Sequence, residues 1–283
     1  MDTEPFDRGL RRLRRDRAAR AGGDADYILR HAADELGHRL GAVTRSFARA
    51  LLLGHGSPAL AALLTEQGME VTHADAGRLY AAGGVQCDED RLPFADGAFD
   101  LVLSVGVLDS VNDLPGALTL IRRALRPDGL FLGAFAGAGS LPRLRRAMHA
   151  AEEAEDAPAA PRIHPQIDLR AAGDLLTRAG FALPVADGET VTVRFSSLAG
   201  LVSDLRAMGA TNALRSRARR PLTRFGLAAA TAEFAAAADP DGKTGERFEI
   251  VYLIGWAPAP GQPQPARRGS ASASLADVLK PPR

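Results

Sequence analysis

Two glycines and a series of acidic residues stand where a nucleotide-like ligand would need them. Gly54 and Gly56 follow an apolar run, and Asp75 and Asp88 follow the next two apolar segments. Glycine lets a ligand approach the backbone closely, because it has no Cβ. A carboxylate such as Asp75 can accept hydrogen bonds from both hydroxyls of a ribose, and Asp88 could accept from the exocyclic amine of adenine. Each element also has a simpler interpretation, since Gly54 could form an ordinary tight turn and acidic residues often cap helices or form turns.

The stretch "LLLGHGSPAL" at residues 51–60 departs from common cofactor loops. Ser57 and Pro58 stand where a third glycine is usual, and no acidic residue precedes Gly54. The loop lacks the Gly-x-Gly-x-x-Gly pattern, which argues against a dinucleotide-dependent oxidoreductase. A helix over 57–67 would still offer free N–H groups to a carboxylate or phosphate, with Pro58 in its first turn.

Asp109 and His164 are the two candidates for acid–base chemistry. We predict that Asp109 lies at the mouth of the pocket, and that His164, which precedes a proline, lies in a loop over the site. Either group could take up a proton that must leave during a reaction. A helix cap or a loop acid is the simpler interpretation of Asp109.

The elements that must position these residues alternate between strand and helix. A parallel, doubly wound α/β sheet with right-handed crossovers is expected, with its ligand at the carboxyl ends of the strands. Ser104 and Val105, in the fourth strand, would then line the floor of the pocket. Strands are predicted at 48–53, 69–75, 84–88, 99–109 and 130–135, with helices at 24–40, 57–67 and 113–129.

After residue 135 the pattern becomes less regular. Residues 136–147 indicate a loop and helix, and the polar, Ala/Pro-rich stretch 150–162 indicates a mobile connection. Helices are predicted at 168–181, 198–209 and 224–238, with strands at 189–197 and 247–258. The Pro/Ser/Arg-rich tail from 261 onward is expected to be poorly ordered.

Composition narrows the class of protein. The 283 residues are 46% hydrophobic and carry a net charge of +1, which gives no argument for nucleic acid or an anionic membrane as partner. Cys87 is the single cysteine, so we expect no internal disulfide and no metal site. No apolar run resembles a secretory signal or a membrane span. We therefore expect a cytoplasmic protein without a transmembrane segment.

Two long stretches resemble a known family. "DEDRLPFADGAFDLVLS" at 88–104 and "VNDLPGALTLIRRALRPDGLFLGAF" at 111–135 are similar to class I S-adenosylmethionine (SAM)-dependent methyltransferases of the type 11 group. Further segments resemble the complex I (NADH dehydrogenase) assembly factor five family, which is related to the biotin-pathway malonyl-carrier methyltransferases. These segments are "FDR" at 6–8, "RAGF" at 178–181, "DLRAMGATN" at 204–212, "YLIGW" at 252–256 and "RRGSASAS" at 267–274.

The resemblance implies a Rossmann-like class I methyltransferase sheet with an antiparallel last strand, extra C-terminal helices and SAM as cofactor. It assigns cofactor contacts to Leu53, Gly54, His55, Gly56, Asp75, Ala76, Asp88, Glu89, Ser104 and Val105. The chain departs from the family at five places. Leu52 replaces an acidic residue, His55 a small one and Pro58 a glycine, while Asp109 and Ser110 replace a His-Trp pair and Gly139 replaces an acid.

The resemblance also implies a function and a partner. The expected activity is modification of a protein arginine, on a quinone-proximal NADH dehydrogenase subunit, by methylation or hydroxylation. Such a partner would bring the protein to the periphery of the inner membrane. Two alternatives stay open: a non-catalytic assembly protein with a degenerate SAM site, and a methyltransferase for a small carrier-linked acid.

The expected division of the chain has three parts. Residues 1–23 form an Arg-rich segment, which the resemblance suggests as a lid over the cofactor, although a solvated basic face is the simpler interpretation. Residues 24–258 form the methyltransferase-like domain, and residues 259–283 form the tail.

Overall fold

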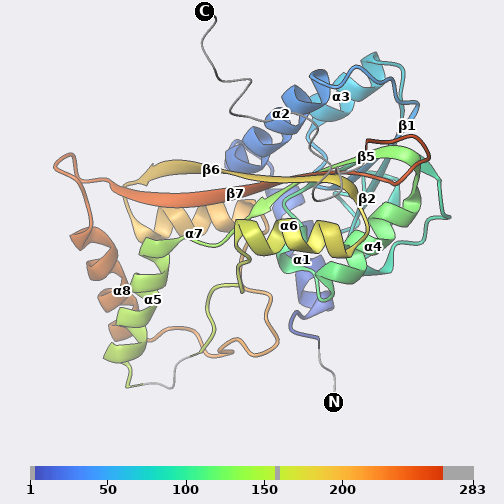
Figure 1. Cartoon of the computed structure of the whole chain (residues 1–283). Helices are drawn as coiled ribbons and strands as arrows, with labels where there is room; N and C mark the ends of the chain where they lie inside the picture. Colours follow the sequence, from blue (N-terminus) through green and yellow to red (C-terminus); the bar gives the residue numbers. More distant parts are fainter. Residues whose placement is uncertain (1–3, 157–159, 264–283) are drawn as a thin grey trace, which may run out of the picture.

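The computed structural model describes residues 4–156 and 160–263, and it has a seven-stranded sheet with helices on both faces (Figure 1). The strand order is β3-β2-β1-β4-β5-β7-β6. The strands are β1 (Arg49–Gly54), β2 (Glu70–Asp75), β3 (Val85–Gln86), β4 (Phe99–Val105), β5 (Leu125–Ala136), β6 (Ala182–Phe195) and β7 (Thr244–Trp256). The helices are α1 (Arg8–Ala21), α2 (Tyr27–Gly41), α3 (Pro58–Glu66), α4 (Leu114–Ala124), α5 (Pro142–Ala154), α6 (Leu169–Arg178), α7 (Leu198–Ala207) and α8 (Arg224–Ala236).

The sequence-based fold class is confirmed. Strands β1 to β5 pair in parallel, and β7 lies antiparallel between β5 and β6. Side chains along β4 alternate between two apolar cores, because successive residues of a strand point to opposite faces. Leu103 packs in the core that contains α2, and Val102 packs in the core that contains α4 and α6. None of the helices in the described ranges is long and apolar enough to cross a membrane.

Several predicted boundaries were wrong. The helix predicted at 113–129 ends at Ala124, because residues 125–129 belong to strand β5, and the strand predicted at 189–197 is Ala182–Phe195. The third strand ends at Gln86, so Asp88 follows the strand instead of ending it, and begins a short 3₁₀ turn at Glu89–Arg91. The fourth strand ends at Val105, because the positive φ of Gly106 turns the chain there. The stretch 150–162 begins inside α5, which reaches Ala154 because its alanines pack against α8. Residues 157–159 and 264–283 lie outside the described residues.

The C-terminal half adds a long antiparallel ribbon to the sheet. Residues 250–256 of β7 pair with both β5 and β6, whereas residues 244–249 pair with β6 alone. The ribbon therefore extends past the other strands, and α5 and α8 pack together beside its far end (Figure 1). The space between this ribbon and the carboxyl ends of β4 and β5 is where the cavity described below lies.

Helix α1 lies at the carboxyl ends of the parallel strands. Asp7 caps it by accepting a hydrogen bond from the Leu10 N–H at 3.0 Å. Arg11 and Arg15 of α1 are almost fully buried against the residues that follow β2, β3 and β4. The Arg-rich segment is therefore part of the packed structure, and its polar face is turned inward, not toward solvent as a basic surface helix would be.

Candidate functional site

The loop after β1 requires glycine for a physical reason. Gly54 has φ +93°, and a Cβ there would stand 2.4 Å from the carbonyl oxygen of Val105. The next residue ties the loop to β4, because the His55 N–H donates to that same carbonyl at 3.0 Å. Ser57 then caps α3, and Pro58 occupies the first turn of that helix. The loop therefore holds the strand-to-helix geometry of a cofactor loop without a third glycine.

His55 is buried within this loop. Burial lowers the pKa of His55, and the nearby carboxylate of Asp26 opposes that effect. Its Nε2 lies 3.3 Å from Asp26 Oδ2, and its ring meets the edge of Tyr80. Among the described residues, neither ring nitrogen has a hydrogen-bond partner. Polar atoms that are buried and unpaired are costly, and a ligand that satisfies them would bind more tightly for it.

Asp75 is fully buried and its carboxylate is held by an arginine of α1. Arg15 Nε lies 2.8 Å from both carboxylate oxygens, and Arg15 Nη2 lies 2.7 Å from Oδ2. The Gly77 N–H also donates to Oδ1. The Arg15 guanidinium is further stacked over the Tyr80 ring, 4.6 Å from its centroid. The carboxylate predicted to hold a ribose is thus already occupied by a group of the protein.

The acidic run after β3 is paired in the same way. Glu89 accepts two hydrogen bonds from Arg11, at 2.7 and 2.9 Å, and raises the pKa of that guanidinium despite its burial. Arg12 bonds Asp88 at 2.5 Å, and Arg8 bonds Asp90 at 2.6 Å. Such charge-assisted pairs are among the stronger protein hydrogen bonds.

These four arginines make one continuous row. Residues 8, 11, 12 and 15 are spaced i, i+3, i+4 and i+7, so they share one face of the helix. We call Arg8, Arg11, Arg12 and Arg15 the arginine row. The row covers the cofactor acids Asp75, Asp88 and Glu89, together with the neighbouring Asp90. Sequence reasoning recognised the arginine content but missed the pairing, which brings together segments 60 to 82 residues apart.

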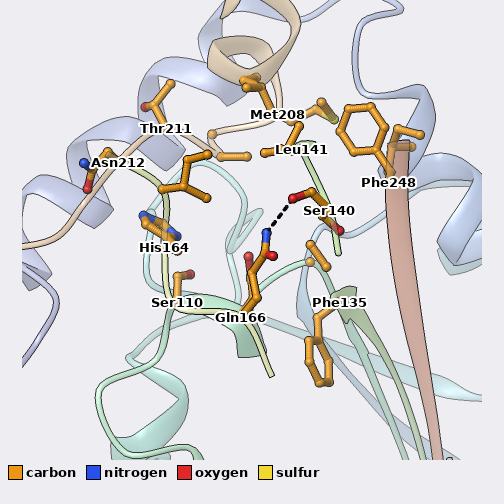
Figure 2. A pocket seen from close by; sticks show the side chains of 18 of the residues that line it. Ser110, Phe135, Ser140, Leu141, His164, Gln166, Met208, Thr211, Asn212 and Phe248 are labelled. Atoms are coloured by element: carbon orange, nitrogen blue, oxygen red, sulfur yellow. Dashed lines mark hydrogen bonds between the residues drawn. The ribbon is translucent and has the colours of Figure 1, made fainter. Parts of the chain in front are cut away.

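Beside the arginine row lies a partly open cavity of about 240 Å³. Its wall is mostly apolar and is built by α1, α2, α5, α7, the end of β5, the middle of β7 and the segments 162–166 and 209–212. Figure 2 shows His164, Asn212 and Ser110 on one side of it and Leu141, Met208 and Phe248 on the other. Gln166 crosses the floor and donates to the Ser140 carbonyl oxygen at 3.1 Å.

Both predicted acid–base candidates reach this cavity. Asp109 lies in the 3₁₀ turn that follows β4, and His164 lies in the segment after α5. Burial lowers the pKa of His164, while Asp109 acts in the opposite direction. His164 Nε2 accepts a hydrogen bond from the Ala213 N–H at 2.9 Å, which keeps that nitrogen unprotonated. Asp109 and His164 are 55 residues apart in the sequence, and the fold brings both to the wall of this cavity.

The other candidate positions are buried near the same edge. Leu53 lies within β1 and Ala76 directly follows β2, and the Ala76 carbonyl oxygen accepts a hydrogen bond from the Gln86 side chain. Ser104 and Val105 lie inside β4, next to the cavity wall at Gly106 and not on it. Ser104 Oγ has no partner in the described residues. The contact of these side chains with a cofactor stays a prediction.

Cys87 offers no reactive thiol. Burial and the neighbouring carboxylates raise the pKa of the Cys87 thiol to about 12. A thiol with such a pKa is protonated near neutral pH and is a poor nucleophile. The side chains of the site that remain available for acid–base chemistry are therefore carboxylates and histidines.

Known proteins are similar in sequence to this chain over most of its length. Residues 51–133 match a family of methyltransferase domains. The arginine-hydroxylase NDUFAF5 of Danio rerio is 34% identical over 97% of this chain and 89% of its own. The chain belongs to this class I methyltransferase family. A malonyl-[acyl-carrier protein] O-methyltransferase of Halorhodospira halophila is 32% identical over 94% of this chain and 92% of its own.

A solved structure supports the fold alone. The YcgJ protein of Bacillus subtilis superposes with a TM-score of 0.54 at 14% identity, covering 81% of this chain and 99% of that one. The resemblance recognised from the segments at 88–104 and 111–135 is thus confirmed.

Proposed function

We propose that this protein binds SAM at the carboxyl edge of β1 to β4 and modifies an arginine side chain of a partner protein. One observation carries the proposal. The glycine loop, Asp75 and the acids Asp88 and Glu89 converge on one edge of the sheet, directly beside an apolar cavity. That arrangement suits a nucleoside-bearing cofactor with an acceptor pocket next to it.

The residues present fit SAM. Asp75 offers two carboxylate oxygens for the ribose hydroxyls, and Asp88 is an acceptor for an adenine amine. His55 and Asp26 stand by the glycine loop and could satisfy the methionine end, where Leu52 gives no carboxylate. Leu52 is part of the apolar core beneath α2, so its replacement of an acid removes a charge that would otherwise need a partner.

SAM supplies a methyl group that a nucleophile can accept. The protein's own task is to align the acceptor and exclude water, because methyl transfer gains most from positioning. The apolar wall of the cavity is suited to both, and Asp109 is a carboxylate on that wall where a proton could be held. A protein arginine as acceptor is supported by the relatives named arginine-hydroxylase, and the family resemblance suggests a quinone-proximal NADH dehydrogenase subunit as its carrier.

A second candidate function is a non-catalytic assembly protein. The Arg15–Asp75 pair favours it, because a permanent pair would keep the ribose hydroxyls from a fully buried carboxylate. Binding of SAM distinguishes the two functions.

Calorimetric titration of SAM into the wild-type protein is the deciding experiment. The enzyme proposal requires binding by the wild type, loss of binding in Asp75→Ala, and unchanged binding in a control, Asp174→Ala, on the exposed face of α6. No binding by the wild type at millimolar SAM contradicts the proposal. Mass spectrometry of the proposed subunit, from cells with and without this protein, then tells a gained methyl group from a gained oxygen atom.

A further inference from the structure

The charges on the cavity wall are almost all neutralised by partners. The ionisable side chains that line it within the described residues are Arg11, Arg15, Asp109, Arg162, His164 and Glu249. Arg11 and Arg15 belong to the arginine row and pair with Glu89 and Asp75. The remaining question is which of the other four can still interact with a ligand.

Two of these four are engaged with neighbours. Arg162 Nε lies 3.1 Å from Glu152 Oε1. Glu249 accepts from the Thr190 hydroxyl at 2.8 Å and lies 3.2 Å from Arg247. Among the described residues, each arginine on the wall therefore has its charge compensated by a carboxylate of the protein.

His164 does not supply a charge. Its Nε2 accepts the Ala213 N–H, so the ring proton of the neutral imidazole sits on Nδ1. Burial and the nearby Arg11 and Arg14 lower its pKa further. His164 can donate a hydrogen bond from Nδ1, but near neutral pH it does not neutralise Asp109.

Asp109 is the exception on this wall. It is half-buried in the turn after β4, and among the described residues its carboxylate makes no hydrogen bond and no ion pair, although the Arg11 guanidinium interacts with it electrostatically. Ser110, its neighbour, is occupied with Arg11 and the Val107 carbonyl oxygen. Within the part of the chain that the structure describes, the cavity thus combines an apolar wall with a carboxylate that has no hydrogen-bonded partner.

We infer that Asp109 is the specificity-determining residue of the cavity, which binds the cationic head of an acceptor whose aliphatic stem lies along the apolar wall. The inference rests on the proposed function and sharpens it, because an arginine side chain has both a cationic head and an aliphatic stem. The N–H donors of its guanidinium form a planar fork that matches a carboxylate, and its methylene groups suit the surface of Leu141, Met208 and Phe248. A malonyl carboxylate would instead be repelled by Asp109, and the described arginines of the wall are already paired with carboxylates.

Binding of small probes tests this without any turnover. The probes are N-acetylarginine methylamide, its neutral counterpart N-acetylcitrulline methylamide, and malonyl-pantetheine as the carrier-linked acid. A charged hydrogen bond contributes about 1.5–3 kcal/mol, so the arginine probe should bind roughly 10- to 100-fold more tightly than the citrulline probe. Malonyl-pantetheine should bind more weakly than the arginine probe.

Variants of Asp109 test whether its carboxylate causes the difference in affinity between the arginine and citrulline probes. Asp109→Asn keeps the shape and removes the charge, so it should bind the arginine and citrulline probes equally. Asp109→Glu keeps the charge and should retain part of the preference. Asp174→Asn, an exposed acid on α6, is the matched control and should behave as the wild type. Thermal unfolding of each variant shows whether it is folded.

The outcomes separate this inference from the proposed function. Equal binding of the arginine and citrulline probes to the wild type, or no binding of the arginine probe at millimolar concentration, overturns the role of Asp109. Titration of the same samples with SAM is an independent measurement, because it tests cofactor binding and not binding of the arginine probe. SAM binding without arginine preference leaves the cofactor proposal intact, and an Asp109-dependent arginine preference without SAM binding leaves the cation site intact.

Discussion

The two halves of the carboxyl edge differ in how their charges are neutralised. The half proposed to bind the cofactor contains the glycine loop, Asp75 and residues 88–90, and we call it the cofactor half; its acids are paired with the arginine row of α1. The half proposed to bind the acceptor is the cavity beyond β4, and we call it the acceptor half; its wall is mostly apolar, and among the described residues Asp109 makes no hydrogen bond and no ion pair. A ligand of the first half must therefore displace a protein group, whereas a ligand of the second half displaces only solvent.

That difference has consequences for both stability and affinity. Removing one member of a buried ion pair costs about 3–5 kcal/mol, because the other charge is left without compensation. Loss of either partner of an arginine-row pair is therefore expected to destabilise the protein, and under the proposed function Arg15 competes with the ribose for Asp75. The acceptor half contributes little electrostatic stability, and its charge is available for recognition.

The largest expected effect comes from removing Asp75. In Asp75→Ala, Arg15 is left buried without its partner, so the free energy of unfolding should fall by about 3–5 kcal/mol. Urea unfolding measures the loss. Adding Arg15→Met to Asp75→Ala should restore most of the free energy of unfolding. It should not restore SAM binding, because the Asp75 carboxylate is still missing. A double variant as unstable as Asp75→Ala would show that the two side chains do not act as a pair.

The glycine loop gives the next effect. Gly54→Ala places a Cβ 2.4 Å from the Val105 carbonyl oxygen at φ +93° and should destabilise the protein by at least about 2 kcal/mol. Gly68→Ala has a similar φ of +83° with nothing within 4 Å, so it should cost only about 1 kcal/mol. Equal losses in urea unfolding would mean that the contact with β4 does not constrain the loop.

Freeing Asp75 should strengthen cofactor binding. In Arg15→Met the ribose hydroxyls no longer compete with a charged pair worth about 1.5–3 kcal/mol, so SAM should bind roughly 10- to 100-fold more tightly. Arg20→Met, on the exposed last turn of α1, is the control and should leave SAM affinity unchanged. A weaker affinity in Arg15→Met would instead identify Arg15 as a ligand of the cofactor.

The smallest effect concerns the buried histidine of the acceptor half. Burial lowers the pKa of His164 below its usual 6.5 in the folded protein, so the unfolded chain takes up a proton first as the pH falls. The stability that neutral His164 contributes is therefore fully present above about pH 6.5, and it is lost as the pH falls toward the pKa of His164 in the folded protein. His164→Gln should flatten this slope by up to about 1.4 kcal/mol per pH unit.

His55 and His73 have lowered pKa values as well, so some slope should remain in His164→Gln. Urea unfolding across the acidic range, for wild type and variant, measures the difference. An unchanged slope would mean that His164 titrates in the folded protein as it does in the unfolded chain.

The sequence predicted the sheet and the place of Asp75 at a strand end well, because both follow from local patterns. Apolar runs bounded by Gly54 and Asp75 identify strand ends directly, and parallel strands bring those ends to one edge. The strand predicted at 189–197 begins earlier in the structure, at Ala182, and so includes Pro184. A proline is tolerated there because β6 is an edge strand with a register shift between Ala182 and Val185.

The pairing of the arginine row could not be predicted in the same way. The helical spacing of Arg8, Arg11, Arg12 and Arg15 is visible in the sequence, as is the acidic run at 88–90. Nothing local fixes how α1 lies against the sheet, so the partner of each arginine depends on the tertiary structure. The cofactor itself was suggested only by the family resemblance.

The most direct test of the account is a crystal structure of this protein with S-adenosylhomocysteine. We expect both ribose hydroxyls within hydrogen-bonding distance of the Asp75 carboxylate, with the Arg15 guanidinium displaced from it. A bound ligand whose ribose lies away from Asp75, with the Arg15–Asp75 pair unchanged, would contradict the account.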